Sequence, residues 1–326
     1  MNTVGLNDEG LGALAMLDGA ADEKTVQNRS AGWIANAIEN RKHYKAGNPT
    51  ISGLAAYVVA AGPSLKKNVH DLKNISRRGM VICVEAAFRY LMEQGIVPEY
   101  CLTIDADERM LSMIDGVDTS RTTLVAMASA SPKLVDRWQG PRLFLRCLGG
   151  RVDIDDKLIA VAREVVAQRD IRAGEVLHPL EDIRVDFKGL GIRVSTGGNV
   201  TGAAHSFAVE HARASHVIFV GADYAWTDPD EFYAGGAHKA LGDERQTAEK
   251  VFSLKSLSGE VSTNFSMFRF KDWHEQYAQA TQIPVVNASE GGILGVDREG
   301  KAVLGWEHMS LADAVAKFSP LEDPRR

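Results

Sequence analysis

The stretch that decides the fold is residues 54–65, which read LAAYVVAAGPSL. Residues 56–61 form an apolar run with the length of a buried strand and with the β-branched Val58 and Val59 at its centre. The run ends at Gly62-Pro63, where glycine permits a sharp turn and proline fixes φ for the first turn of a helix. The stretch therefore predicts a buried strand that turns tightly into a helix.

Similar apolar runs recur along the chain, and together they predict six strands, at residues 56–61, 80–84, 100–104, 123–128, 142–147 and 216–220. Amphipathic segments between them predict helices over residues 65–77, 86–94, 132–139 and 200–214. Short buried strands joined by helices are typical of an open parallel sheet with right-handed crossovers. We therefore predict an α/β, Rossmann-like fold with an open, mostly parallel sheet.

The segments around this sheet differ in character. Residues 1–50 are polar with helix-like spacing and predict a helical N-terminal extension. The Rossmann-like domain is expected over residues 51–295, with residues 149–199 as an inserted, lid-like segment that includes a helix over 157–168. A Ser/Thr-rich stretch at 253–263, a helix over 265–280 and a strand at 284–287 precede a C-terminal extension, residues 296–326.

Composition limits the function classes. The 326 residues are 45% hydrophobic and carry 37 basic and 43 acidic side chains, a net charge of −6, so no nucleic-acid partner is expected. No apolar run approaches the roughly 20 residues of a membrane span, and Asp8 and Glu9 are unlike the start of a signal peptide. We expect a cytoplasmic protein without a membrane span, and a homo-oligomer is one option for its assembly.

The cysteines do not indicate redox or metal chemistry. Cys83, Cys101 and Cys147 each lie in a strand-like run, without a CxxC pair. We expect buried thiols and no redox cofactor.

Candidate site residues follow the predicted strands, because ligands of open parallel sheets collect at the strands' carboxyl ends. Gly62, Pro63 and Ser64 follow the first strand. They could form a turn that binds phosphate, or a purely structural turn from the strand into the helix. The stretch matches neither the dinucleotide fingerprint nor the P-loop.

Asp105 and Asp107 follow the third strand with DxD spacing. Such carboxylates can bind a divalent cation, here Mg²⁺, that bridges diphosphate oxygens. The alternative is that Asp107 and Glu108 place negative charge at a helix N-terminus.

Two polar loops complete the set. Thr196, Gly197, Gly198 and Asn199 precede a predicted helix and offer hydroxyls and amides to an anionic or sugar-like ligand. After the strand at 216–220, Asp223 is a candidate base, and Tyr224 and Trp226 are candidates for stacking on a ring or for core packing.

Two histidines are possible catalytic groups. His205 lies among apolar residues of a predicted helix, where packing is as good an explanation as catalysis. His238, in the loop Gly235-Gly236-Ala237-His238-Lys239, is a second candidate base on a segment able to close over a ligand.

Four segments in this order resemble a known family: 58–65 (VVAAGPSL), 103–107 (TIDAD), 219–228 (FVGADYAWTD) and 286–293 (VNASEGGI). They resemble the domain shared by bacterial motility accessory factor glycosyltransferases and archaeal-type 6-hydroxymethyl-7,8-dihydropterin diphosphokinases. The resemblance covers about residues 25–295 and implies a Rossmann-like domain related to bacterial sialyltransferases. The chain lacks the long flanking domains that accompany this core in the motility factors.

The resemblance implies a nucleotide-sugar-dependent glycosyltransferase that passes a CMP-activated nonulosonic (sialic-acid-like) sugar to a hydroxyl acceptor on a protein or glycan. Gly62, Pro63 and Ser64 would hold donor phosphate, Gly197, Gly198 and Asn199 would line the nucleotide site, and Asp223 with Tyr224 would face the reacting end. The alternative is an ATP- and Mg²⁺-dependent pterin diphosphokinase with the metal at Asp105 or Asp107. A third option is a non-enzymatic accessory module that keeps the fold.

Overall fold

A computed structural model of the chain describes residues 32–33, 35–44, 53–147, 192–228, 232–236 and 251–320. Its centre is a nine-stranded sheet in the order β11-β10-β7-β1-β2-β3-β4-β5-β6. Every neighbouring pair is parallel. The strands are β1 (Ala55–Val59), β2 (Gly79–Val84), β3 (Tyr100–Thr103), β4 (Thr123–Met127), β5 (Arg142–Cys147), β6 (Ile192–Val194), β7 (His216–Val220), β10 (Val285–Asn287) and β11 (Trp306–His308).

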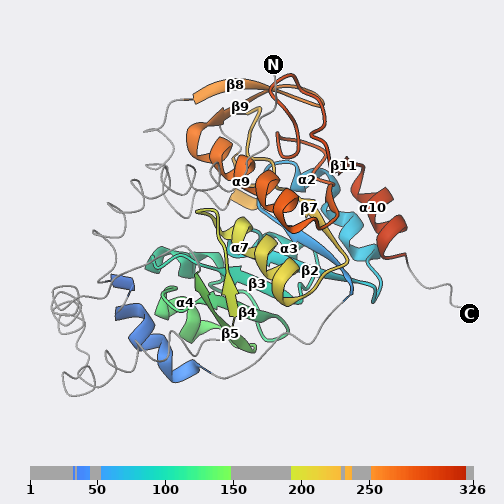
Figure 1. The fold of residues 1–326 in the computed structure, drawn as a ribbon. Coiled ribbons are helices and arrows are strands. Elements are labelled where there is room, and N and C mark those ends of the chain that lie inside the picture. Colours follow the sequence, from blue (N-terminus) through green and yellow to red (C-terminus); the bar gives the residue numbers. More distant parts are fainter. Residues whose placement is uncertain are drawn as a thin grey trace, which may run out of the picture.

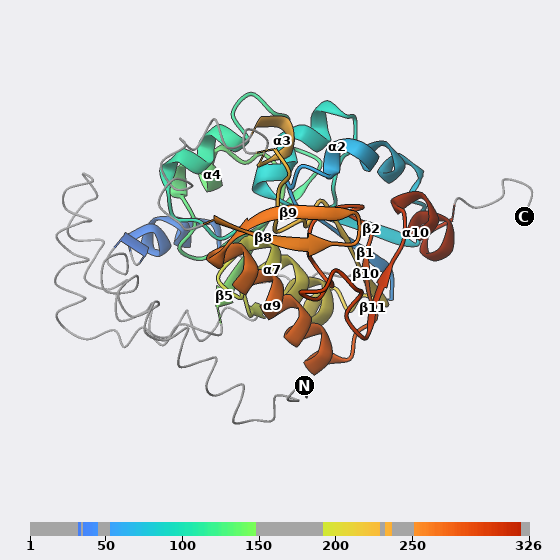
Figure 2. The same ribbon diagram turned by 90° about the horizontal axis from the view of Figure 1, so that it is seen from above.

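Helices cover both faces of the sheet (Figures 1 and 2). One face carries α2 (Leu65–Asn68) with η2 (Val69–Asn74), α3 (Glu85–Glu93), η3 (Glu108–Met113) and α4 (Pro132–Arg137). The opposite face carries α7 (Val200–Ser206), its π-helical continuation η5 (Phe207–His211) and α9 (Phe265–Thr281). Three further elements are η1 (Arg41–His43), η6 (Ala234–Gly236) and α10 (Leu311–Phe318). This is the doubly wound α/β arrangement that the sequence predicts.

The central strand β1 explains why the apolar run at 56–61 decides the fold. All five of its residues are buried, and it pairs with β2 on one side and β7 on the other. Because helices cover both faces of the sheet at β1, the side chains on both faces of this strand must be apolar. The sequence is therefore continuously apolar here and does not alternate between apolar and polar residues. The other predicted strands are found within two residues of their expected bounds. The predicted thiols Cys83 and Cys101 are buried, whereas the side chain of Cys147 lies outside the description.

The helix predicted over 65–77 is shorter than expected because it changes geometry at Asn68. Asn68 leaves the helical backbone region with φ −129°. Its buried side-chain amide donates to the Ala288 carbonyl oxygen at 3.0 Å and to Glu290 Oε1 at 2.8 Å. Contacts with the segment after β10 therefore accompany the change from α2 to the 3₁₀-helical η2.

Several elements are not predicted by the sequence patterns. The short edge strands β6 and β11 carry charged residues, and their apolar runs are too brief to stand out. β6 ends the segment predicted as an insertion, and β11 and α10 lie in the predicted C-terminal extension, so both segments contribute to the main domain. The Ser/Thr-rich stretch forms the antiparallel hairpin β8 (Val251–Ser256) and β9 (Gly259–Asn264). The helix predicted over 157–168 lies outside the described residues.

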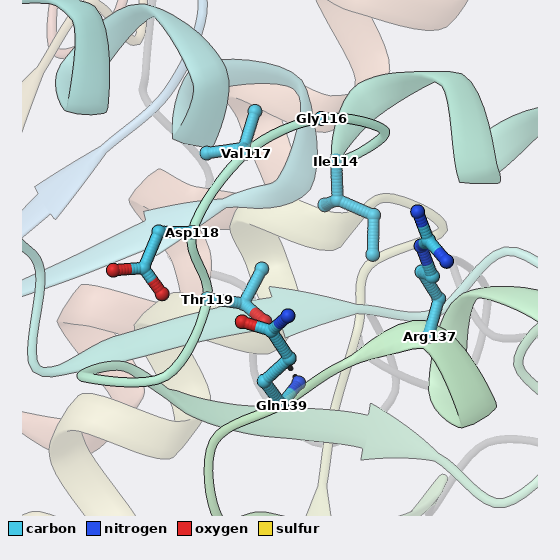
Figure 3. Close-up of a pocket in the computed structure, with 7 residues that line it drawn as sticks. All are labelled: Ile114, Gly116, Val117, Asp118, Thr119, Arg137 and Gln139. Atoms are coloured by element: carbon cyan, nitrogen blue, oxygen red, sulfur yellow. Dashed lines mark hydrogen bonds between the residues drawn. The ribbon is translucent and has the colours of Figure 1, made fainter.

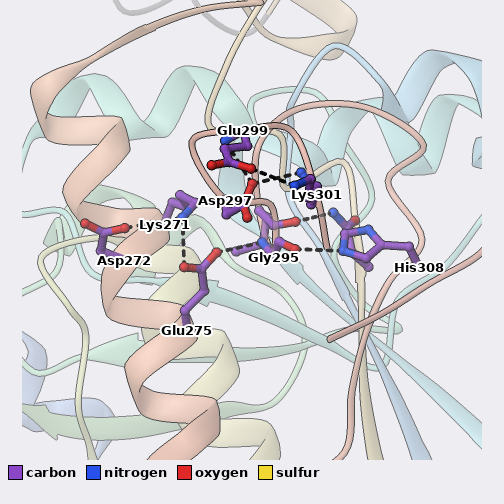
Figure 4. A network of polar contacts seen from close by, with 10 residues as sticks. Lys271, Asp272, Glu275, Gly295, Asp297, Glu299, Lys301 and His308 are labelled. Carbon is purple, nitrogen blue, oxygen red and sulfur yellow. Dashed lines mark hydrogen bonds and ion pairs between the residues drawn. The ribbon is translucent and has the colours of Figure 1, made fainter. Parts of the chain in front are cut away.

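A polar network ties α9 to the segment before β11 (Figure 4). Glu275 Oε1 accepts from the Gly295 amide at 2.9 Å, and its other oxygen pairs with Lys271 at 2.8 Å. Burial raises the pKa of Glu275 to about 7 against the opposing effect of Lys271. His308 Nε2 lies 2.9 Å from the Gly295 carbonyl oxygen, so this network also reaches β11.

The N-terminal extension is described in part, with helical residues at 35–40. Two buried asparagines dock it onto the loops after β3 and β4. Asn36 Nδ2 donates to the carbonyls of Ala106 and Ser129 at 3.1 and 3.0 Å. Asn40 Nδ2 donates to those of Ala128 and Ala130 at 3.0 and 2.9 Å.

Within the described ranges, no helix has both the length and the apolar character that crossing a membrane would require.

The docking of this N-terminal helix predicts an unequal effect of two nearby substitutions. Asn40→Ala removes the donor to two loop carbonyls and should lower the free energy of unfolding by about 2–3 kcal/mol in urea titrations. Lys42→Ala breaks an exposed ion pair with Asp136 at 2.9 Å and should cost at most about 1 kcal/mol. Equal effects of the two substitutions would contradict the role assigned to Asn40.

Candidate functional site

The candidate site lies where the strand order reverses. From β1 the chain proceeds through β2, β3 and β4 on one side, and β7 and β10 lie on the other side. In doubly wound sheets the crevice for ligands opens at the carboxyl ends of the strands at this point. The segments after β1, β7 and β10 meet there, around the carboxylate of Asp223.

Asp223 and Ser64 connect the ends of β7 and β1. The Ser64 amide donates to Asp223 Oδ2 at 2.7 Å, and the Ser64 hydroxyl donates to Asp223 Oδ1. Both residues are buried. Burial raises the pKa of Asp223 to about 6, while the Ser64 bonds and Lys67 act in the opposite direction. The predicted base is therefore also the acceptor that holds the predicted phosphate turn in place.

Glycine is required at Gly62 because two chain segments approach closely. Its amide donates to the Gly221 carbonyl oxygen at 2.7 Å. A Cβ at Gly62 would lie 2.4 Å from that oxygen and 2.6 Å from Asp223 Oδ2. Any larger residue would push β1 and β7 apart at their carboxyl ends.

The third segment, residues 288–293, closes over Asp223 from β10. The Ile293 amide donates to the Asp223 carbonyl oxygen at 2.8 Å, and Ser289 Oγ accepts from the Ala222 amide at 3.0 Å. Gly292 has φ +73°, and a Cβ there would lie 2.1 Å from the Asp223 carbonyl oxygen. The Glu-Gly-Gly element of the sequence thus belongs to the same site as the Gly-Pro-Ser turn.

The amides of the Gly-Pro-Ser turn are engaged within the chain. The Gly62 amide bonds Gly221, the Ser64 amide bonds Asp223, and Pro63 has none. The amides of Leu65 and Lys66 donate to the carbonyls of Gly62 and Pro63. In this conformation the amides of the turn already donate within the chain and are not available to a phosphate. The phosphate-binding role of the turn stays a prediction.

The glycine loop after β6 reaches the same edge of the sheet. Asn199 caps α7, with Oδ1 accepting from the Gly202 amide at 2.9 Å, and the Tyr224 hydroxyl lies 3.4 Å from the same oxygen. Gly197 and Gly198 have positive φ, and a Cβ at Gly197 would lie 2.2 Å from the ring of Trp273. Thr196 accepts from the Gly198 amide at 3.2 Å. The structure therefore brings this predicted loop to Tyr224.

Two buried histidines extend from Tyr224. The Tyr224 hydroxyl lies 2.6 Å from His274 Nε2, and His274 Nδ1 lies 3.0 Å from His205 Nδ1. Burial lowers the pKa of His205 to about 3 and also lowers that of His274, so both rings are neutral at pH 7. The burial of His205 agrees with the packing role that the sequence analysis gave as one alternative. The sequence analysis did not single out His274, which lies among the polar residues of α9.

Two other predicted site residues have different outcomes. Trp226 is buried, its ring packs on Phe232, and its backbone pairs with Ser262 of β9, which agrees with the core alternative. His238 lies outside the described residues.

The DxD pair is only partly arranged as a metal site would require. Asp107 Oδ1 accepts from the Arg109 backbone amide and so caps η3, which matches the helix-terminus alternative, and Oδ2 accepts from the Arg109 guanidinium. Asp105 Oδ1 accepts from the Asp107 amide at 3.0 Å. No group of three metal-ligating side chains occurs in the described part of the chain. The Arg109 guanidinium thus pairs with Asp107 in this conformation, and a metal role of Asp105 and Asp107 stays a prediction.

Glu85 is a buried acidic residue that the sequence patterns do not single out. It follows β2 directly. Burial raises the pKa of its carboxyl to about 8, opposed by the Glu85 amide and reinforced by Asp105. The sequence could have indicated Glu85 because an acidic residue directly follows the second apolar run. An acidic residue is also favourable in the first turn of a helix, so its presence there does not require a ligand.

A separate hollow of about 260 Å³ lies at the amino ends of β4 and β5 (Figure 3). Its lining includes Asp118, Thr119 and Arg137. The Thr119 hydroxyl oxygen already accepts from the Gln139 amide at 2.8 Å. The hollow lies at the edge of the sheet opposite to the candidate site, so the two cannot share a small ligand.

The fold and site define a class: a doubly wound α/β protein with a polar site at the switch point of a parallel sheet. Within this class, residues 32–229 match the family model described as 6-hydroxymethylpterin diphosphokinase MptE-like. The chain belongs to this MptE-like family. A search of curated proteins finds no match.

The structure is also similar to that of the Maf glycosyltransferase from Magnetospirillum magneticum AMB-1, with a TM-score of 0.58 and 14% sequence identity. The similarity covers 87% of this chain and 38% of the glycosyltransferase, so the chain spans about two fifths of that protein. It shows a shared fold that extends beyond the residues matched by the family model.

The raised pKa of Glu85 predicts a pH-dependent stability. The folded state keeps a proton up to about pH 8 that the unfolded state, with its ordinary pKa of 4.5, has released. The contribution of this bound proton to the free energy of unfolding is fully present below pH 4.5. It falls by up to about 1.4 kcal/mol per pH unit between pH 4.5 and pH 8. The stability of the wild type should therefore decline relative to Glu85→Gln between about pH 5 and 8.

Urea titrations at several pH values measure this difference, with Glu93→Gln in the last turn of the same helix as control. Parallel stability curves for the wild type and Glu85→Gln would contradict the assignment.

Proposed function

We propose that this protein is a glycosyltransferase that uses a nucleotide-activated sugar, with a CMP-activated nonulosonic sugar as the donor. The supporting observation is the third segment of the site. Residues 288–293, which close over Asp223, lie beyond the family-model match at 32–229. The structural similarity to a Maf glycosyltransferase spans more of the chain than that match. The likeness to a glycosyltransferase therefore extends past the part shared with the diphosphokinase family model.

In this proposal the donor lies across the carboxyl ends of β1 and β7. The glycine loop at 196–199 and the first turn of α7 hold the leaving phosphate, because the first amides of a helix have no acceptor within it. Tyr224 faces this loop and is held by His274. The neutral histidine keeps the phenol oriented without adding a charge.

The reaction exchanges one bond to the anomeric carbon for another. The bond from that carbon to the phosphate oxygen breaks, the acceptor oxygen bonds to the carbon, and CMP leaves with the bonding electrons. The acceptor proton passes to Asp223 through the Ser64 hydroxyl, which donates to this carboxylate. With a pKa of about 6, Asp223 is ionised and able to take the proton above that pH.

A second candidate is the pterin diphosphokinase, favoured by the family model. It would transfer a diphosphate from ATP to a hydroxymethyl group and would require Mg²⁺, with Asp105 as the carboxylate nearest to the β3 end. Hydroxyl acceptors are common to both reactions, so the nucleotide and the metal distinguish them.

Thermal unfolding with a panel of nucleotides tests these functions. We expect CMP or CTP to raise the midpoint without metal, since a ligand at about 100 times its Kd adds roughly 2.7 kcal/mol to stability. UDP and GDP are the controls. Stabilisation by ATP only with Mg²⁺ would favour the diphosphokinase, and no response to any nucleotide would favour a non-enzymatic accessory module.

Asp223→Asn tests the proton acceptor. We expect kcat to fall by about 10²- to 10⁴-fold and the rise in activity around pH 6 to disappear. Because an asparagine amide replaces one acceptor of the Ser64 bonds, stability should also fall by about 1–3 kcal/mol, so thermal unfolding and CMP binding are measured in parallel.

Ser64→Ala removes the hydroxyl through which the acceptor proton is proposed to pass, so kcat should fall. The substitution also removes a hydrogen bond that lowers the pKa of Asp223, so the residual activity should rise at a higher pH than in the wild type.

A kcat of Asp223→Asn close to that of the wild type would remove this carboxylate from the mechanism.

A further inference from the structure

The hairpin of β8 and β9 lies on the outside of the molecule and is joined to the candidate site (Figures 1 and 2). Ser262 of β9 exchanges two main-chain hydrogen bonds with Trp226, at 2.8 and 2.9 Å. The Thr263 hydroxyl donates to the Tyr224 carbonyl oxygen at 2.8 Å. Because Tyr224 and Trp226 follow Asp223 in the loop after β7, the hairpin extends directly from the site.

The main-chain groups of β8 point alternately toward β9 and away from it. Ser262 uses its amide and carbonyl for Trp226, so it forms a non-hydrogen-bonded pair with Ser253, the residue opposite on β8. The amide and carbonyl of Ser253 therefore point outward, and the alternation gives the same direction to those of Val251 and Lys255. These outward groups make no backbone hydrogen bond within the described part of the chain. β8 thus presents an open edge.

This edge has few of the features that prevent strands from pairing. Natural proteins protect open edges with proline, β-bulges or lysines, because an open edge pairs with other extended chains. The six residues of β8 read VFSLKS and include no proline. The register with β9 runs without a bulge from Val251 to Ser256, and Lys255 is the single charged residue of the strand. The edge is therefore suited to accept a further strand.

The inner side of the hairpin is anchored, while apolar side chains are exposed on its outer side. Leu254 packs against the buried cluster that contains Ile293, the residue that bonds to the backbone of the site. Val251 and Phe265 are 50% and 62% exposed, and they lie close together because Val251 is opposite Asn264. A strand added to β8 would therefore meet ordered main-chain groups and an apolar contact for its own side chains.

We infer that the open edge of β8 binds the acceptor of the transfer reaction, and that this acceptor is a polypeptide segment that adds to the hairpin as an extended strand. The inference rests on the proposed function and names the class of its acceptor. Main-chain pairing suits a polypeptide, because a glycan has no alternating amides and carbonyls to match the edge. With strands about 4.8 Å apart, the added strand lies about 14 Å from the backbone of Trp226. The hydroxyl that reacts therefore belongs to a residue beyond the paired stretch.

Peptide binding tests the inference. The probe is a fluorescent peptide of alternating threonine and valine with a lysine at each end, compared with the same peptide methylated on its main-chain amides. Methylation removes the main-chain donors and leaves the side chains unchanged. In fluorescence anisotropy the wild type should bind the unmethylated peptide at least about tenfold more tightly.

Hydrogen exchange locates the peptide on the protein. In the free protein the amides of Val251, Ser253 and Lys255 should exchange faster than those of Phe252 and Leu254, which point to β9. The bound peptide should slow the exchange of the first three by at least about tenfold. Protection of these three amides in the free protein would show that a second copy or another part of the chain covers the edge, and would overturn the inference.

Ser253→Pro removes an outward amide without breaking a hydrogen bond to β9, because an edge strand tolerates proline where its amide faces solvent. We expect a peptide affinity at least about tenfold lower and a Tm close to that of the wild type. Ser253→Thr keeps the amide and is the matched control, which should bind the peptide like the wild type. Leu254→Pro removes an amide that points to β9 and should lower the Tm.

Equal binding of the two peptides by the wild type, or full binding of the probe by Ser253→Pro, would overturn the inference. A wild type that responds to CMP in thermal unfolding but binds neither peptide would overturn it as well and leave the proposed function standing. Peptide binding without a response to any nucleotide would overturn the proposed function and, with it, the role of the peptide as acceptor.

Discussion

The contact between Ser64 and Asp223 is the constraint on which the site depends. It joins the ends of β1 and β7, the two strands between which the sheet reverses direction. A buried carboxylate is costly unless it is hydrogen-bonded, and here a backbone amide and a hydroxyl of the same residue supply those bonds. The segment after β10 then packs on the backbone of Asp223 through Gly292 and Ile293. Glycines occupy the positions where a side chain would separate these segments.

The two faces of the sheet bring different chemistry to this edge. On the face of α7 and α9, Tyr224 is held by a chain of two histidines that burial keeps neutral. Tyr100 packs on Phe207 of that face, so Thr103, three residues along β3, points to the face of α3 and α4. There the polar groups are hydroxyls and a carboxyl with a raised pKa. One edge thus carries a phenol and a glycine loop on one face of the sheet, and buried hydroxyls without a partner among the described residues on the other face.

The family model and the structural neighbour cover different parts of this arrangement. Residues 32–229 contain Gly62, Glu85, Asp105 and Asp223, whereas His274 and Gly292 come from the C-terminal part. The similarity to the Maf glycosyltransferase concerns the fold, and this chain spans 38% of that protein.

Sequence by itself determined the α/β class and, within two residues, the positions of β1, β2, β3, β4, β5, β7 and β10, because buried parallel strands require continuous apolar runs. It also predicted that a site would lie at the carboxyl ends of these strands. Only the tertiary structure decided which polar residues meet. Asp223 and Ser64 are 159 positions apart and are joined by the strand order, which no local pattern encodes. Glu85 and His274 escape recognition in the sequence because Glu85 is explained as a helix start and His274 lies among the polar residues of α9. The ion pair between Asp107 and Arg109 is likewise not evident in the sequence, because a side-chain ion pair depends on rotamers and packing that spacing alone does not specify.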